Sequence, residues 1–101
     1  MPSHLIKVHK TYRLVVAVCD AELLGKKFEE GNKQLNIMLN FYNGEEIQEE
    51  ELMKTLIDLA KEDATFNIAG KSSVNCALKC GIISKAGIKK VQGVPFALVL
   101  L

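Results

Sequence analysis

Four short groups of residues carry side chains that could do chemistry. They are the pair Cys19-Asp20, the run Gly70-Lys71-Ser72-Ser73, the cysteines Cys76 and Cys80, and the histidines His4 and His9. A thiol becomes a nucleophile when a nearby base helps it to lose its proton. The two histidines are five residues apart on a predicted strand, so they point to opposite faces and at most one can serve Cys19. Cys19 and Asp20 are therefore weak catalytic candidates, and we predict a buried cysteine followed by an aspartate that caps the next turn.

The run Gly70-Lys71-Ser72-Ser73 precedes a predicted helix and offers N–H groups, an ammonium and hydroxyls to an anion. A nucleotide-hydrolysing phosphate loop also needs a glycine five residues before Gly70. Thr65 stands at that position, so the full motif is absent. Two interpretations remain for these four residues: an anion-binding turn, or the ordinary capped start of a helix.

Cys76 and Cys80 are one helical turn apart, a spacing that suits two ligands of one metal ion. A structural zinc site needs further ligands, but the chain has no second cysteine pair and its two histidines cannot chelate together. We therefore predict no metal and no cofactor. Cys76 is expected on the helix surface, opposite the apolar stripe, and three cysteines suit free thiols in a reducing compartment.

The net charge of +1 conceals an uneven distribution along the chain. All twelve acidic residues lie between Asp20 and Asp63, where only five lysines accompany them, so this segment has a charge of −7. Residues 1–19 have a charge of +3 and residues 64–101 a charge of +5, without any acid. If folding brings the two ends together, they form one basic face. The nucleic-acid-binding residues that this predicts are Lys7, His9, Lys79, Lys85, Lys89 and Lys90.

The elements that must position these residues follow from hydrophobic periodicity. Residues 14–19 form an unbroken apolar run, typical of a central strand with both faces covered. Stripes at spacings of three and four predict helices over 49–63 and 72–80. The other predicted strands are 4–9, 26–29, 34–41, 45–47, 65–69, 88–91 and 94–101. The expected fold is α+β, a two-layer sandwich with a mixed or mostly antiparallel sheet and the two helices on one face.

Length and composition agree with one domain spanning residues 1–101. The chain is 49% apolar and 25% charged, as in an ordinary globular protein. Its apolar runs are far shorter than the ~18 residues that cross a membrane, and the segment before Asp20 lacks a signal-peptide pattern. We expect a cytoplasmic protein without membrane association.

Several blocks of sequence have a recognisable order. They are Val16 to Lys26 with Phe28, Glu30 and Gly31; Phe41, Tyr42 and Gly44; Asn67, Ile68, Gly70, Val74 and Gly81; and Gly93-Val94-Pro95. With these blocks the chain resembles, over nearly its whole length, the small archaeal family catalogued as domain of unknown function 424. The resemblance implies a compact two-layer α/β domain of archaeal origin without an established activity. A histidine and an alanine often follow Gly-Val-Pro in that family, whereas this chain has Phe96-Ala97, so a role built on that histidine is not carried over.

The charge distribution favours a non-enzymatic binding module that contacts RNA or a ribonucleoprotein through its basic face. The single arginine and the 6% aromatic content weigh against base stacking. Two alternatives stay open. One is an enzyme for a small phosphorylated or carbonyl substrate, acting through Cys19 and Asp20 or through the turn Gly70–Ser73. The other is a protein-interaction subunit that uses the apolar C-terminal strand, residues 96–101, a strand through which a homo-oligomer could also form.

Overall fold

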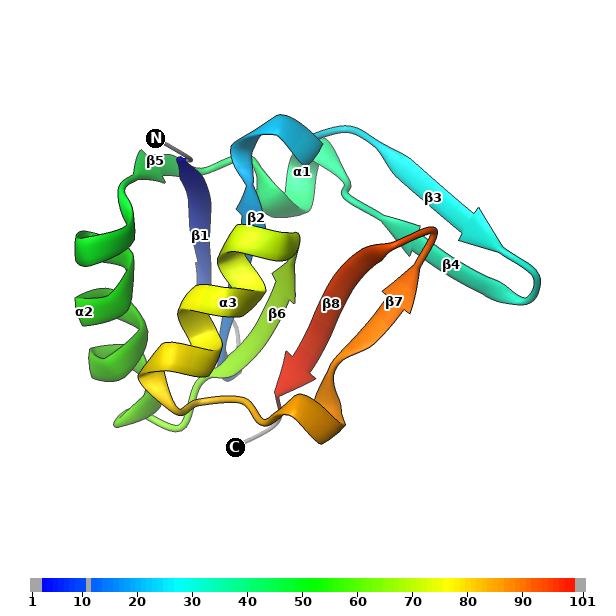
Figure 1. The fold of residues 1–101 in the computed structure, drawn as a ribbon. Helices are drawn as coiled ribbons and strands as arrows, with labels where there is room; N and C mark the ends of the chain where they lie inside the picture. Colours follow the sequence, from blue (N-terminus) through cyan, green and yellow to red (C-terminus); the bar gives the residue numbers. More distant parts are fainter. Residues whose placement is uncertain (1–2, 11, 100–101) are drawn as a thin grey trace.

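The computed structural model describes residues 3–10 and 12–99. Its main feature is a six-stranded sheet with the strand order β5-β1-β2-β6-β8-β7 (Figure 1). The strands are β1 (His4–Lys10), β2 (Leu14–Asp20), β5 (Glu45–Ile47), β6 (Thr65–Ala69), β7 (Lys89–Val91) and β8 (Val94–Val99). The predicted α+β class is confirmed, and the sheet is mixed because β2 and β6 run parallel.

Strand β2 occupies the interior of the sheet, as its unbroken apolar sequence predicts. It pairs with β1 in an antiparallel register and with β6 in a parallel one. Val16 and Val18 are fully buried toward one face, and Ala17 and Cys19 toward the other. A strand covered on both faces needs apolar side chains throughout, and the sequence of β2 provides them.

Helices α2 (Glu49–Ala60) and α3 (Lys71–Cys80) cover the same face of the sheet, as predicted (Figure 1). Leu52, Leu56, Val74 and Ala77 pack there against strand residues such as Phe66. Helix α2 ends at Ala60, before the predicted end at residue 63. The chain must reverse there to enter β6, and Asp63 takes a left-handed conformation (φ 56°) to do so.

The opposite face is covered by a second, smaller group of elements. A two-stranded sheet of β3 (Lys27–Glu30) and β4 (Lys33–Asn36) projects from the main body (Figure 1). Between this hairpin and the main sheet lie the short helices η1 (Ala21–Leu23) and α1 (Leu39–Tyr42). Together they bury Cys19 against Ile37 and Tyr42. A second cluster of buried residues therefore lies on the face opposite α2 and α3.

The predicted strand over residues 34–41 is wrong in its second half. The hairpin ends where Ile37 N–H donates to Lys26 O (2.9 Å), because β3 offers no further partner beyond that point. Residues 39–42 then form a helical turn, α1. This turn buries Tyr42 and stacks the ring of Phe41 on His9, with centroids 4.7 Å apart. Alternation of apolar residues predicted a strand here, but the strand partner is missing.

The C-terminal apolar residues enter the sheet, with β8 between β6 and β7. The predicted strand tail is confirmed as far as Val99, while residues 100 and 101 lie outside the described residues. The short 3-10 helix η2 (Lys85–Gly87) connects α3 to β7. Helix α3 ends at Cys80, and Gly81 follows it in the left-handed conformation (φ 79°) that commonly terminates helices. None of the described helices is both long and apolar enough to span a lipid bilayer.

Candidate functional site

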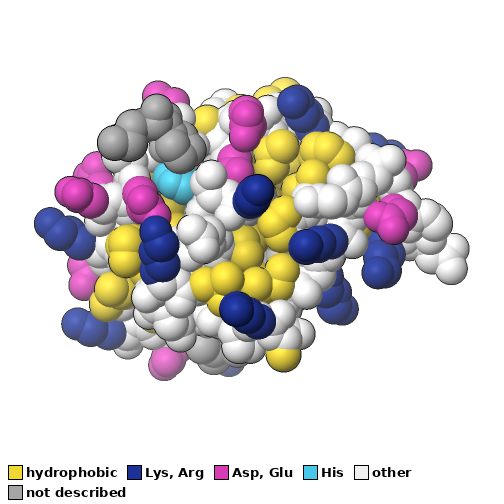
Figure 2. Space-filling model, in the orientation of Figure 1, with side chains coloured by type: hydrophobic (Ala, Val, Ile, Leu, Met, Phe, Trp, Pro, Cys, Tyr) yellow, Lys and Arg dark blue, Asp and Glu magenta, His cyan; other side chains and the backbone are white. Residues whose placement is uncertain are grey.

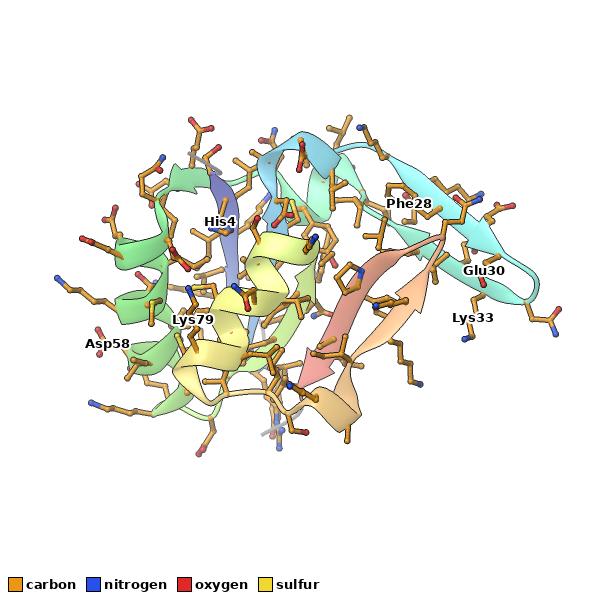
Figure 3. All side chains as sticks on the ribbon, in the orientation of Figure 1. His4, Phe28, Glu30, Lys33, Asp58 and Lys79 are labelled. Atoms are coloured by element: carbon orange, nitrogen blue, oxygen red, sulfur yellow. The ribbon has the colours of Figure 1, made fainter. Side chains whose placement is uncertain are left out.

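The end of β2, the start of β1 and the start of α3 meet in a buried polar cluster formed by His4, Asp20 and Ser73. Each of these residues is at most 5% exposed. The Asp20 carboxylate accepts hydrogen bonds from Ser72 N–H (3.1 Å) and Ser73 N–H (2.7 Å). His4 Nδ1 and Ser73 Oγ are hydrogen-bonded at 2.8 Å, and His4 Nδ1 lies 3.9 Å from Asp20 Oδ1. Figure 3 shows His4 on β1, toward the helical layer.

Asp20 caps a different helix from the one expected. It stands at the N-cap position of η1 but makes no side-chain hydrogen bond to that turn. Its partners are instead 52 and 53 residues further along the chain, at the start of α3. The parallel pairing of β2 with β6 produces this contact, because Cys19 pairs with Ala69 and the chain then continues into α3. Asp20 is a helix cap, as predicted, but of a helix distant in sequence.

The predicted anion-binding turn already holds an internal anion. The N–H groups of Ser72 and Ser73 both point to the Asp20 carboxylate. Gly70 lies against this carboxylate so closely that a Cβ atom at residue 70 would overlap it. These N–H groups are therefore engaged by Asp20, and the capped-helix interpretation describes Gly70–Ser73. Lys71 and Ser72 also face a neighbouring cavity, described below.

The buried cluster has the residue types of a serine-nucleophile triad but not its arrangement. In such a triad the serine and the carboxylate contact different ring nitrogens of the histidine. Here Ser73 Oγ and Asp20 Oδ1 both approach Nδ1 of His4. Ser73 is also fully buried and presents no surface to solvent. The cluster instead fastens β1, β2 and α3 together through satisfied hydrogen bonds.

Cys19 lies in an environment that suppresses thiolate formation. Burial, reinforced by the nearby Asp20 carboxylate, raises the pKa of the Cys19 thiol to about 12. Its side chain has no exposed surface and packs into the second cluster of buried residues. His4 lies on the opposite face of the sheet, hydrogen-bonded to Ser73. The geometry thus supports the prediction of a buried structural cysteine.

Cys76 is fully buried, contrary to the expectation of a surface position. Helix α2 covers this side of α3, so α3 has two buried faces, one toward the sheet and one toward α2. Cys76 Sγ donates to Glu49 O (4.0 Å) and Cys80 Sγ donates to Met53 O (3.7 Å). Burial raises the pKa of Cys76 to about 12. The sequence pattern identified the face of α3 that packs on the sheet. It did not identify the face that α2 buries.

The six residues of the predicted basic face do not form one surface. The acid-free segments do meet, since β2 pairs with β6, but neither of these strands carries a lysine. Lys7 and His9 lie on β1, whereas Lys89 and Lys90 lie on β7, with three strands between them. Lys7 Nζ donates to Asn40 O (3.0 Å), and His9 Nε2 is hydrogen-bonded to Phe41 O (2.9 Å). Both therefore lie on the α1 side of the sheet, opposite α3.

The other predicted basic residues are themselves divided. Lys79 forms an ion pair with Glu49 of α2 at 3.0 Å and points toward that helix (Figure 3). Lys89 pairs with Phe96 and Lys90 with Pro95, so the two lysines project from opposite faces of β7. Lys85 is exposed on η2. Of these residues, Lys90 shares a cavity with α3.

This cavity, about 470 Å³ in volume, lies between α3 and the β7–β8 ribbon. Its lining residues are Lys71, Ser72, Val74, Asn75, Leu78, Ile88, Lys90 and Pro95. Figure 2 shows hydrophobic side chains gathered over this region with Lys or Arg side chains around them. Sequence reasoning missed the cavity, because no pattern indicates that residues 71–78 and 88–95 come together.

The fold and these sites define a small α+β protein with a mixed sheet, two helices on one face and a lysine-flanked cavity. The family model described as Protein of unknown function (DUF424) matches residues 9–101, so the chain belongs to this family, as its sequence blocks suggested. No curated protein matches the chain.

A solved structure, that of an uncharacterized conserved protein from Methanopyrus kandleri, is similar to this one. The TM-score is 0.84 at 24% sequence identity, and the match covers 97% of this chain and 92% of that one. At this level of identity the likeness shows the shared fold alone.

Proposed function

We propose that this protein is a small cytoplasmic binding module that contacts RNA, free or in a ribonucleoprotein, through the face formed by α3, η2 and β7. This face is referred to below as the cavity face. Its cations are Lys71 and Lys90, which line the cavity, together with Lys85, which is exposed on the adjoining η2. The observation that carries the proposal is the position of Lys71 and Lys90 beside the cavity. Among the described residues, neither Lys71 nor Lys90 forms an ion pair with a carboxylate.

The lysines of the cavity face differ from Lys79 and Lys27, which form ion pairs with carboxylates. Lys79 is neutralised locally by Glu49, and Lys27 by Glu29 at 3.1 Å. In Figure 2 carboxylates and Lys or Arg side chains are interspersed over α2 at the left of the view, whereas Lys or Arg side chains border the apolar region over α3 and β7–β8. Cations without a local counter-charge are those that can neutralise phosphates and release their counterions.

Lys71 lacks a purely structural explanation. It is the first residue of α3, and a positive charge at a helix N-terminus is unfavourable next to the helix dipole. Asp20 provides the negative charge that this helix end prefers. An external phosphate beside Lys71 gives its ammonium group a role that the helix itself does not require.

The test is a titration of single-stranded RNA into the protein at about 50 and about 200 mM salt. With three phosphate contacts, the affinity for a single strand is expected to fall about twentyfold between these conditions. Lys90→Gln should weaken binding and make the salt dependence shallower, because one contact is lost. Lys79→Gln is the matched control, since its ammonium is already paired with Glu49 and is expected to change binding little.

Three results would contradict the proposal. They are a lack of binding at the lower salt concentration, binding that does not respond to salt, and equal effects of Lys90→Gln and Lys79→Gln. Far-UV circular dichroism of each variant establishes that the fold is retained, so that a loss of binding reports on the surface.

A further inference from the structure

We infer that the cavity between α3 and β7 receives one unpaired nucleotide of a bound RNA strand. The inference rests on the proposed function and adds to it the part of the ligand that is recognised. The cavity has a volume of about 470 Å³, which lies within the range of ~300–1,000 Å³ that is usual for small-molecule sites. A site for phosphates alone would need only the surface lysines, whereas here the lysines stand at the rim of a hollow.

The lining of the cavity combines three kinds of group. Its apolar surface comes from α3 on one side and from the ribbon on the other, through Val74, Leu78, Ile88 and Pro95. Ser72 and Asn75 supply a hydroxyl and an amide, which can both donate and accept hydrogen bonds. Lys71 and Lys90 supply positive charge. A ligand that matches all three has an apolar body, a hydrogen-bonding edge and an anionic group.

A nucleotide has these three parts joined in one molecule. Its base can lie between aliphatic side chains, its edge can meet the Asn75 amide, and its phosphate can meet a lysine. A base inside a duplex is stacked on both faces and paired along its edge, so it cannot enter. A single strand can turn one base outward, which is the usual way in which RNA sequence is recognised. The cavity therefore selects single-stranded over double-stranded RNA.

A residue of the cavity lining can be substituted without disturbing the hydrophobic core. Asn75 lies on the exposed side of α3, between the buried residues Val74 and Cys76. Asn75→Met places a longer side chain in the cavity while leaving Lys71 and Lys90 in place. Asn75→Asp instead places a carboxylate there, which repels phosphate. Asn32, exposed in the turn between β3 and β4 and absent from the cavity lining, provides the matched controls Asn32→Met and Asn32→Asp.

The experiment compares a single-stranded RNA of about 12 nucleotides with a blunt duplex of the same sequence, using fluorescence anisotropy at about 50 mM salt. We expect the wild-type protein to bind the single strand about tenfold more tightly. Asn75→Met should remove this preference and leave the salt dependence unchanged, because the lysines remain. Asn75→Asp should weaken the binding of both RNAs. The Asn32 variants should behave as the wild type.

The outcomes separate the inference from the proposed function. Equal affinity for single and double strands, or equal behaviour of Asn75→Met and Asn32→Met, overturns the inference while RNA binding stands. A lack of RNA binding overturns both. A mononucleotide is titrated in parallel, and if it binds as tightly as the strand, the ligand is a free nucleotide and the inference of a strand is wrong.

Discussion

Polar residues lie on both sides of helix α3, but the two groups have different roles. Toward β1 and β2, the polar groups of His4, Asp20 and Ser73 are buried and satisfy one another. Toward β7, the lysines Lys71 and Lys90 stand at the rim of a cavity. The comparison teaches that residue type alone does not identify a site. A buried group that has found its partner inside the chain stabilises the fold, whereas a rim group without one is available to a ligand.

The first prediction concerns the close contact between Gly70 and the Asp20 carboxylate, on the buried side of α3. Gly70→Ala should destabilise the protein by about 3 kcal/mol or more, since a Cβ atom would overlap the Asp20 carboxyl and the φ of 107° is strained for other residues. Gly81→Ala is the matched control, because its φ of 79° is also positive but nothing lies near its Cβ position; a loss of about 1 kcal/mol is expected. Urea unfolding measures both, and equal losses would show that the contact with Asp20 is unimportant.

The second prediction concerns the negative charge that caps α3. Asp20→Asn keeps the size of the side chain but removes the charge from the two hydrogen bonds with Ser72 and Ser73, so we expect a loss of about 2 kcal/mol in the free energy of unfolding. The affinity of the folded variant for RNA should stay within about twofold, because the cavity lysines are unchanged. If Asp20→Asn is as stable as the wild type but no longer binds RNA, then Asp20 serves RNA binding and not the stability of the fold, which contradicts this prediction.

The third and smallest effect is a dependence of stability on pH. Burial lowers the pKa of His4 below its ordinary value of about 6.5, although Asp20 and Glu49 oppose this. The unfolded chain therefore takes up the proton more readily than the folded one. The stability supplied by neutral His4 is present above about pH 6.5 and is lost as the pH falls through the lowered pKa.

Urea unfolding between pH 7.5 and pH 5.5 measures this contribution as a difference between two proteins. The wild type should lose up to about 1 kcal/mol per pH unit more than His4→Gln, in which the titrating group is absent. His9→Gln, on the opposite face of the sheet, should retain the contribution of His4. Identical pH profiles for the wild type and His4→Gln would show that the buried histidine does not titrate in this range.

Much of the fold could be predicted from local patterns. The apolar run of β2 and the apolar stripes of α2 and α3 can be buried by any apolar neighbour. Their positions can therefore be predicted without knowing which segment covers them. The end of β4 does not, because an extended chain at residues 37–41 needs a strand partner that the hairpin no longer provides. Local alternation cannot reveal that a partner is missing.

Local sequence patterns predicted less of the candidate site than of the fold. The partner of Asp20 is fixed by the parallel pairing of β2 with β6, and the burial of Cys76 is fixed by the approach of α2. The separation of Lys7 from Lys90 follows from the strand order, which charge counting along the chain does not contain. Each of these depends on which distant segments become neighbours.

The cap of α3 also imposes an order on synthesis. Asp20 is synthesised 52 residues before Ser72, so its carboxylate has no partner at the α3 end while those residues are added. A helix of ten residues is too short to persist alone, and α3 becomes stable only when it meets this waiting acceptor. A nascent chain released before residue 73 therefore keeps an unpaired charge at the end of its central strand and cannot close the core around it.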